Sequence, residues 1–196
     1  MNSDSVLEIF REITKIPRES GHEEKMTAFL QNFAKEHGLG CRTDATGNVV
    51  ITKEASKGKE NVPAIALQSH QDMVCEKTST SRHNFVTDPI DYVIEDGWMI
   101  AKETTLGADD GIGVAATLAL LASDLNTGKV EGLFTISEET GMDGANAAGT
   151  GNKDTDIFTT RYLDKNELVK DGWQWMYDPV DPTKVLTFTD TDWQSK

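Results

Sequence analysis

A histidine and an aspartate stand two positions apart where an apolar run ends. The segment ALQSHQDMVCEK, residues 66–77, contains His70 and Asp72. A metal-binding histidine normally donates its other ring N–H to a carboxylate, a carbonyl or water, which fixes the tautomer of the ring. The pair therefore fits a metal ligand and the residue that orients it. Taken alone, the same pair also fits an ordinary loop.

Further carboxylates stand at similar places in the chain. They are Glu138 and Glu139 after one predicted strand, Asp164 after another, and Asp109 before an apolar helix. Because sites in open α/β sheets lie beyond the carboxyl ends of the strands, we expect these side chains to converge with His70 at one edge. Each carboxylate alone also fits a helix cap or a solvated turn.

The residue types indicate which metal such a site would hold. One histidine and several carboxylates, without a thiolate, suit zinc, with manganese and cobalt as second choices. Water bound to such a metal becomes a nucleophile near neutral pH, and a carboxylate that is not a ligand can accept its proton. The adjacent Glu138 and Glu139 allow this division of roles. Because clustered carboxylates raise one another's pKa, Glu138 or a neighbour should have a raised pKa without metal.

The charge of the chain argues against nucleotides and nucleic acids as ligands. The 196 residues carry a formal net charge of −14, and the sequence shows no basic stripe for a phosphate backbone. The glycine-rich segment GADDGIGVA, residues 107–115, superficially resembles a phosphate-binding loop. Its adjacent Asp109 and Asp110 would repel a phosphate, whereas they suit a cation.

The apolar spacing predicts the elements that position these residues. Two amphipathic helices are expected first, one capped by Ser3 or Asp4 and ended by Pro17, the other from the segment SGHEEKM to Gly38. The other expected elements are a strand pair at 41–53, a fully buried strand at 63–68, a hairpin at 92–102 with Asp96-Gly97 at its turn, a buried helix at 110–124, and strands at 129–136 and 156–163.

This order of elements predicts an α/β fold, with a mostly parallel sheet and helices on both faces. The N-terminal residues lack the pattern of a signal peptide, and no apolar run reaches the length of a transmembrane helix. Two cysteines, Cys41 and Cys75, do not make a disulfide framework. We therefore expect a cytoplasmic protein with reduced cysteines and no membrane partner.

Several segments resemble, in sequence and in order, the zinc-dependent dipeptidase family. They are IPRESGHEEKM, DATGNVVI, LQSHQDMVCEK, TDPI, TLGADDGIGVA and FTISEETGMDGA, all within residues 1–146. The resemblance implies that residues 1–164 form the N-terminal part of a zinc-peptidase-like catalytic domain, which is incomplete. It further implies two zinc ions and short peptides as substrates. Residues 165–196 match nothing in the family and are expected to be a divergent aromatic tail.

The resemblance also implies a role for each candidate residue. The implied zinc ligands are His70, Asp109, Glu139 and Asp164, of which Asp109 bridges the two ions. Asp164 lies in YLDKNE, which is similar to the family's Leu-Asp-Ser-Glu-Glu segment. Asp72 is implied as the residue that orients His70, and Glu138 as the general base.

The chain also departs from the family. Family members are much longer, with a lid domain and a last histidine ligand from their C-terminal half. The histidines of this chain are His22, His37, His70 and His83, all before Asp164. Three functions therefore compete: a dinuclear-metal hydrolase of short peptides, a truncated or degenerate relative that binds metal weakly at most, and an unrelated acidic α/β binding module. Besides a short peptide, the expected partner is a second copy or a complementing chain.

Overall fold

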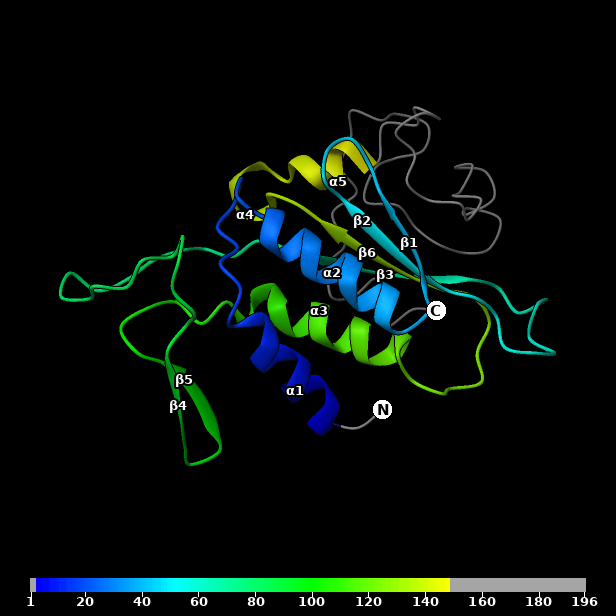
Figure 1. The fold of residues 1–196 in the computed structure, drawn as a ribbon, viewed down its shortest axis with the longest axis horizontal. Helices are drawn as coiled ribbons and strands as arrows, with labels where there is room; N and C mark the ends of the chain where they lie inside the picture. The colour runs from blue at the N-terminus through cyan, green and yellow to red at the C-terminus, as the bar shows by residue number, and fades with distance from the viewer. Residues whose placement is uncertain (1–2, 149–196) are drawn as a thin grey trace, which may run out of the picture. The chain divides into compact units, whose positions relative to one another are not determined.

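The computed structural model describes residues 3–148 of the 196-residue chain (Figure 1). The helices in this part are α1 (Ser3–Ile13), α2 (Glu24–Glu36), α3 (Ala108–Leu121), α4 (Glu138–Gly141) and α5 (Asp143–Ala148). The strands are β1 (Gly40–Thr43), β2 (Val49–Lys53), β3 (Ile65–His70), β4 (Tyr92–Glu95), β5 (Trp98–Ala101) and β6 (Val130–Thr135). The predicted strand at 156–163 and the predicted tail at 165–196 lie outside the described residues, so the domain boundary at residue 164 stays a prediction.

Four of the described strands form one sheet in the order β1-β2-β6-β3. Strands β3 and β6 run parallel, whereas the β1–β2 and β2–β6 pairings are antiparallel. The predicted α/β class is confirmed. Within the described residues, however, the predicted parallel arrangement holds only for β3 and β6. Strands joined by a tight hairpin are antiparallel, and β2 pairs with β6 in the same antiparallel sense.

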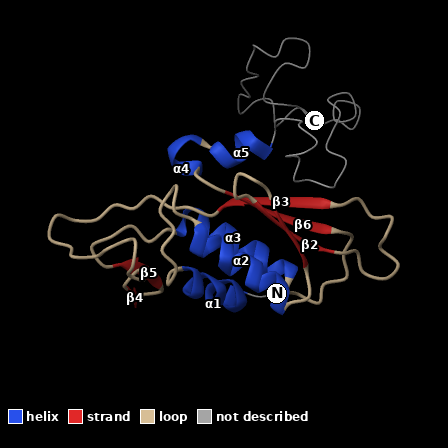
Figure 2. Ribbon diagram, turned by 45° about the horizontal axis from the view of Figure 1, so that its top comes forward, coloured by secondary structure: helices blue, strands red, loops and turns tan. Residues whose placement is uncertain are grey.

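Helices cover both faces of the sheet, as predicted. Figure 2 shows α1, α2 and α3 on one side of the sheet and α4 and α5 on the other. The main apolar core joins the sheet to the three long helices through Phe10, Ile13, Met26, Leu30, Val49, Ile51, Val114, Leu118, Leu121, Val130 and Phe134. A smaller cluster contains Val50, Leu133 and Ala148. Alternate strand residues therefore supply the two clusters, as the pleat of a strand requires.

Helix α3 packs closely against the sheet, which confirms the predicted burial of this apolar helix. A Cβ atom added to Gly132 of β6 would lie 2.7 Å from Cγ2 of Thr117 and 3.0 Å from Cδ1 of Leu121. These distances are too short for side-chain packing, so the glycine permits the close approach of helix and strand. The second half of α3 is thereby held against β6.

The prediction of a fully buried strand at residues 63–68 was wrong. The corresponding strand β3 is buried only at Ser69 and His70, and Ile65 is 50% exposed. Among the described strands β3 pairs only with β6, so it forms an edge of this sheet. Burial therefore increases along β3 toward its carboxyl end, where the candidate site begins.

The predicted hairpin is confirmed and lies apart from the main sheet. Strands β4 and β5 form a two-stranded sheet, and Asp96 and Gly97 at its turn have φ values of 50° and 83°. Positive φ at both turn positions matches the twist of a tight hairpin. Trp98 is 73% exposed on this hairpin.

Within residues 3–148, the helices are too short or too polar to cross a bilayer.

Candidate metal centre

His70 is the last residue of β3 and lies at the carboxyl edge of the sheet. Its ring is buried, with Nδ1 3.1 Å from the backbone oxygen and 3.2 Å from Oδ1 of Asp72. Nε2 lies 3.0 Å from Oδ1 of Asp109 and 3.9 Å from Oε2 of Glu138. One ring nitrogen is therefore engaged by Asp72, and the other is the nitrogen that a metal ion would use.

Asp72 is fully buried and accepts hydrogen bonds from several directions. Its carboxylate accepts the Ser20 hydroxyl at 2.7 Å and the backbone N–H groups of Glu138 and Glu139 at 3.1 and 3.2 Å. Burial favours the neutral acid, but the hydrogen bonds from His70, Ser20 and the two amides outweigh it and hold the pKa of Asp72 well below its usual range. Asp72 is therefore a fixed negative charge behind the histidine.

Glu138 and Glu139 bring two further carboxylates to His70. One ligand atom from each of these three residues lies within 4.8 Å of the others. The two glutamates begin α4, which follows β6 directly. Because β3 and β6 are parallel and pair His70 with Thr135, their carboxyl ends meet at the same edge of the sheet.

Asp109 reaches the same histidine from the start of α3. Its backbone is not helical, with φ −85° and ψ 114°, and its peptide bond to Asp110 is cis. The side chain of Asp109 is 86% exposed beside His70. Asp110, in contrast, accepts the N–H of Gly113 at 3.2 Å within the first turn of α3. The helix-capping explanation therefore applies to Asp110, whereas Asp109 faces the histidine.

The protonation equilibria of the cluster favour a cation. Burial lowers the pKa of His70, but hydrogen bonds to Asp72 and Asp109 and the nearby acidic charges raise it to about 9. Partial burial, followed by repulsion from Asp109, Glu138 and Asp72, raises the pKa of Glu139. This confirms that a neighbour of Glu138 has a raised pKa in the metal-free state. A bound cation would relieve the repulsion among these carboxylates.

The structure thus brings together most of the predicted site residues. Those that converge are His70, Asp72, Asp109, Glu138 and Glu139. Asp164 lies outside the described residues, so its place as a ligand stays a prediction. The donor set consists of one imidazole and several carboxylates that share a small space, and it fits a divalent ion of the zinc, manganese or cobalt type.

Sequence reasoning missed a buried arginine that supports this cluster. Arg18 is buried and donates to the backbone oxygens of Gln71 at 3.0 Å, of Asp72 at 2.7 Å, and of Gly107. It therefore ties the loop after β3 to the start of α3. Burial, opposed by the charge of Asp72, lowers the pKa of Arg18 to about 10. The only signal was a charged run in the segment IPRESGHEEKM between two amphipathic helices, and this run does not reveal its contacts.

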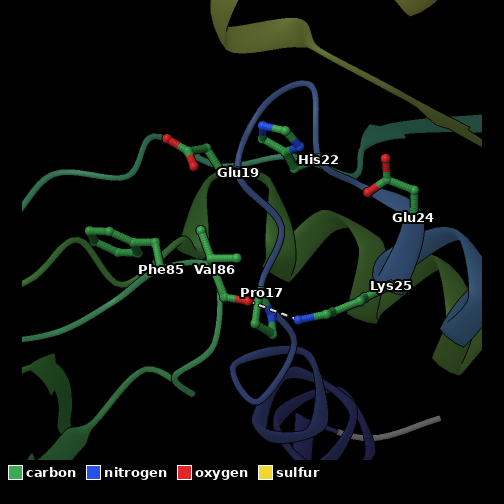
Figure 3. Close-up of a pocket in the computed structure, with 7 residues that line it drawn as sticks. All are labelled: Pro17, Glu19, His22, Glu24, Lys25, Phe85 and Val86. Atoms are coloured by element: carbon green, nitrogen blue, oxygen red, sulfur yellow. Dashed lines mark hydrogen bonds between the residues drawn. The ribbon is translucent and has the colours of Figure 1, made fainter.

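A separate pocket of about 160 Å³ is lined in part by the same segment (Figure 3). Its lining includes Pro17, Glu19, His22, Phe85 and Val86. The loop that carries Phe85 and Val86 is fastened there because Lys25 Nζ donates to the backbone oxygen of Val86 at 2.8 Å. The lining contains none of the residues gathered around His70, so this pocket is distinct from the candidate metal centre.

No protein-family model matches the chain. The chain is 45% identical over 139 residues to cytosol non-specific dipeptidase of Escherichia coli strain K12, which covers 70% of this chain and 29% of that protein. Among solved structures, aminoacylhistidine dipeptidase from Vibrio alginolyticus matches with a TM-score of 0.71 and 44% identity, over 74% of this chain and 30% of that one. A tripeptidase from Staphylococcus aureus matches with a TM-score of 0.61 and 26% identity, over 74% and 39%.

The two solved structures share the fold of this chain over 74% of its length, and all three relatives resemble it in sequence. The chain spans about three tenths of the length of the two dipeptidases that it matches. At 45% identity over 139 residues, the likeness reflects common descent. The chain is therefore homologous to the bacterial dipeptidases of this family, and the match fits the N-terminal part of those longer proteins.

Proposed function

We propose that the chain carries the metal-binding part of a dinuclear-metal hydrolase that cleaves short peptides. The observation that carries the proposal is the convergence of Asp109, Glu138 and Glu139 on the outward-facing nitrogen of His70. Its homology to a cytosol non-specific dipeptidase supports dipeptides as the substrate class. When bound, divalent metal supplies Lewis-acid activation of a peptide carbonyl and of a water molecule.

The residues of the chain would have separate roles in metal binding and catalysis. His70, Asp109 and Glu139 would hold the metal, together with Asp164 from beyond the described residues. Zinc is the first choice for such donors, with manganese or cobalt as alternatives. Asp72 engages Nδ1 of His70 from behind, so that Nε2 faces Asp109 and would be the nitrogen that holds the metal.

Glu138 would act as the general base. Its carboxylate would accept a proton from the attacking water and deliver that proton to the leaving amine of the peptide. The position of Glu138 supports this role, because its backbone N–H is fixed by Asp72 while its Oε2 lies 3.9 Å from Nε2 of His70. Glu139, the next residue, is then left to bind metal.

Two substitutions test the division of roles. In Glu138→Gln, hydrolysis of a dipeptide should fall about 100-fold or more while zinc bound per chain stays unchanged. In Glu139→Gln, zinc affinity itself should fall by about tenfold or more. Loss of zinc along with activity in Glu138→Gln would mean that the two glutamates have the opposite roles.

The wild-type chain, measured with added zinc, separates the competing functions. Zinc binding together with dipeptide turnover supports the hydrolase. Zinc binding without turnover supports the non-catalytic relative. Failure to bind zinc, manganese or cobalt would overturn both proposals and leave the acidic binding module.

The proposed cellular location follows from the same relative. Its name, cytosol non-specific dipeptidase, supports a cytoplasmic location for this chain. A second copy or a complementing chain is proposed as the protein partner.

A further inference from the structure

The turn that presents the two glutamates depends on one residue in an unusual conformation. Ser137 lies between β6 and α4 and has φ 49° and ψ 42°, the left-handed region. A residue with a Cβ atom is uncommon there and persists when its surroundings hold it in place. Glu138 and Glu139 follow directly, so the backbone at Ser137 sets the direction in which both carboxylates leave the sheet.

Glu23 holds this residue from the other end of the described chain. Oε1 of Glu23 accepts the backbone N–H of Ser137 at 2.9 Å and its hydroxyl at 3.0 Å. Both residues are buried. Hydrogen bonds between buried groups and a carboxylate are stronger than neutral ones, and losing the acceptor would leave two buried donors unsatisfied.

The side chain of Glu23 does not cap the helix at whose N-terminus Glu23 lies. Glu23 occupies the N-cap position of α2, but its side chain makes no capping hydrogen bond with that helix in the described structure. The backbone oxygen of Glu23 begins α2 by accepting the N–H of Thr27 at 2.8 Å. Its carboxylate is directed instead to Ser137, 114 positions away.

In this turn, residues 136–139, each backbone N–H donates a hydrogen bond to a side chain from another segment. Asn48 accepts the N–H of Ile136, Glu23 that of Ser137, and Asp72 those of Glu138 and Glu139. Asp72 also orients His70, so its two contacts relate the glutamates to the histidine. Glu23 is the other buried carboxylate that accepts an N–H of this turn.

We propose that Glu23 is a positioning residue, which fixes the turn at Ser137 and thereby aims Glu138 and Glu139 at the metal centre. This inference rests on the proposed metal site for its consequence, although the contact itself does not depend on metal. Glu23 does not touch the cluster and acts only through Ser137. Its role therefore differs from that of a buried carboxylate that merely stabilises the fold.

The first experiment measures amide hydrogen exchange in the metal-free 196-residue chain. In Glu23→Ala, the N–H groups of residues 137–139 should exchange about tenfold faster, because local opening replaces a held turn. Strand β6 should keep its wild-type exchange rate. Glu23→Gln retains an acceptor oxygen and should restore most of the protection. Glu24→Ala removes the neighbouring exposed carboxylate and serves as the matched control, with wild-type exchange throughout.

Two results would overturn the proposal. One is unchanged exchange at residues 137–139 in Glu23→Ala, and the other is equal acceleration in β6, which would show only a general loss of stability. If Glu23→Ala does not fold, Ser137→Ala carries the test, since it removes one of the two contacts with little change in volume. It should accelerate exchange locally by about threefold, and the absence of a local change would also overturn the proposal.

The second experiment measures zinc affinity in the same variants. Affinity should fall about tenfold in Glu23→Ala, the size of effect typical of residues that support metal ligands, and stay unchanged in Glu24→Ala. An unchanged affinity in Glu23→Ala would overturn the aiming role. If the wild-type chain binds no zinc, the proposed function fails, while the exchange data still decide whether Glu23 holds the turn.

Discussion

The side chains behind His70 differ sharply from those in front of it. The buried support consists of Asp72, which engages the ring from behind, together with Arg18 and Glu23, and all three are hydrogen-bonded. In front of it lie the carboxylates of Asp109 and Glu138, whose side chains are 86% and 38% exposed. The first group forms a fixed support, and the second forms a crowded, solvent-facing set of carboxylates.

The difference shows how one site reconciles stability with cation binding. Buried charges are tolerated when they are paired and hydrogen-bonded, so the support can stabilise the fold without metal. The front carboxylates repel one another, and this repulsion adds to burial, which is the larger cause, in raising the pKa of Glu139. Because a bound cation would reduce this repulsion, the carboxylates favour the binding of a cation. Substitutions in the buried support should therefore affect folding and metal binding together, whereas substitutions of the proposed ligands in front, Asp109 and Glu139, should affect metal binding much more than folding.

The largest expected effect comes from exchanging one carboxylate in each group. Asp72→Asn replaces an acceptor of several hydrogen bonds with an amide that places N–H donors against other donors. It should lower the free energy of unfolding by about 2–4 kcal/mol and also weaken zinc binding. Asp109→Asn should weaken zinc binding as strongly but change the free energy of unfolding by less than about 0.5 kcal/mol. Urea unfolding of the metal-free chain, together with zinc titration, measures both quantities.

Equal loss of stability in the two variants would contradict the distinction between support and ligands. Glu24→Gln provides a control on the surface, because it also removes a carboxylate and leaves both groups untouched. It should leave unfolding and zinc binding at wild-type values.

The front of the site was the more predictable of the two groups. Its members directly follow strands or precede a helix, so local patterns place them at one sheet edge, as seen for His70 and Glu139. Of the support, Asp72 was predicted from its position two residues after His70, whereas Arg18 and Glu23 were not. Arg18 contacts backbone oxygens 53 and 54 positions away, and Glu23 contacts Ser137 at a separation of 114. No local sequence pattern predicts such contacts. In the sequence, a polar side chain that makes one cannot be distinguished from another polar side chain of similar length that does not.

The fold shows the same division. The amphipathic helices, the Asp96-Gly97 turn and the buried helix α3 follow from local periodicity and turn chemistry, and all are present. Pairing partners depend on the whole topology. An apolar run at residues 63–68 predicts burial, but strand β3 has one described neighbour and exposes Ile65. The antiparallel pairing of β2 with β6 likewise has no local signature.

A pH series on the metal-free chain tests how the two groups act on the ring between them. The folded-state pKa of His70 is raised from 6.5 to about 9, since hydrogen bonds to Asp72 and Asp109 outweigh burial. A raised pKa contributes stability that is complete below pH 6.5 and is lost as the pH rises through about 9. The free energy of unfolding, measured with a chelator present, should therefore decline across this interval. In His70→Gln this decline should be smaller.

With zinc bound, the same decline should shrink, because the ion takes the place of the proton on Nε2. A metal-free chain whose stability is flat across this pH interval would show that the carboxylates do not hold the protonated ring. Asp109→Asn should give an intermediate slope, since it removes one of the two hydrogen-bonding carboxylates and leaves Asp72 in place.

The smallest expected effect is at Cys75, where the buried support meets the surface. Burial, followed by the charge of Glu19, raises the pKa of the Cys75 thiol to about 11, while Arg18 opposes this shift. Because the thiolate is the reactive form, alkylation of Cys75 should be slow at neutral pH. Glu19→Gln removes the largest electrostatic cause and should speed alkylation by about twofold to threefold, a change that corresponds to a few tenths of a pKa unit. Cys41 is the internal control, because burial alone accounts for its raised pKa. Mass spectrometry of the modified chain resolves the two sites, and an equal acceleration at Cys41 would point to a general loosening of the structure instead of a local field at the edge of the support.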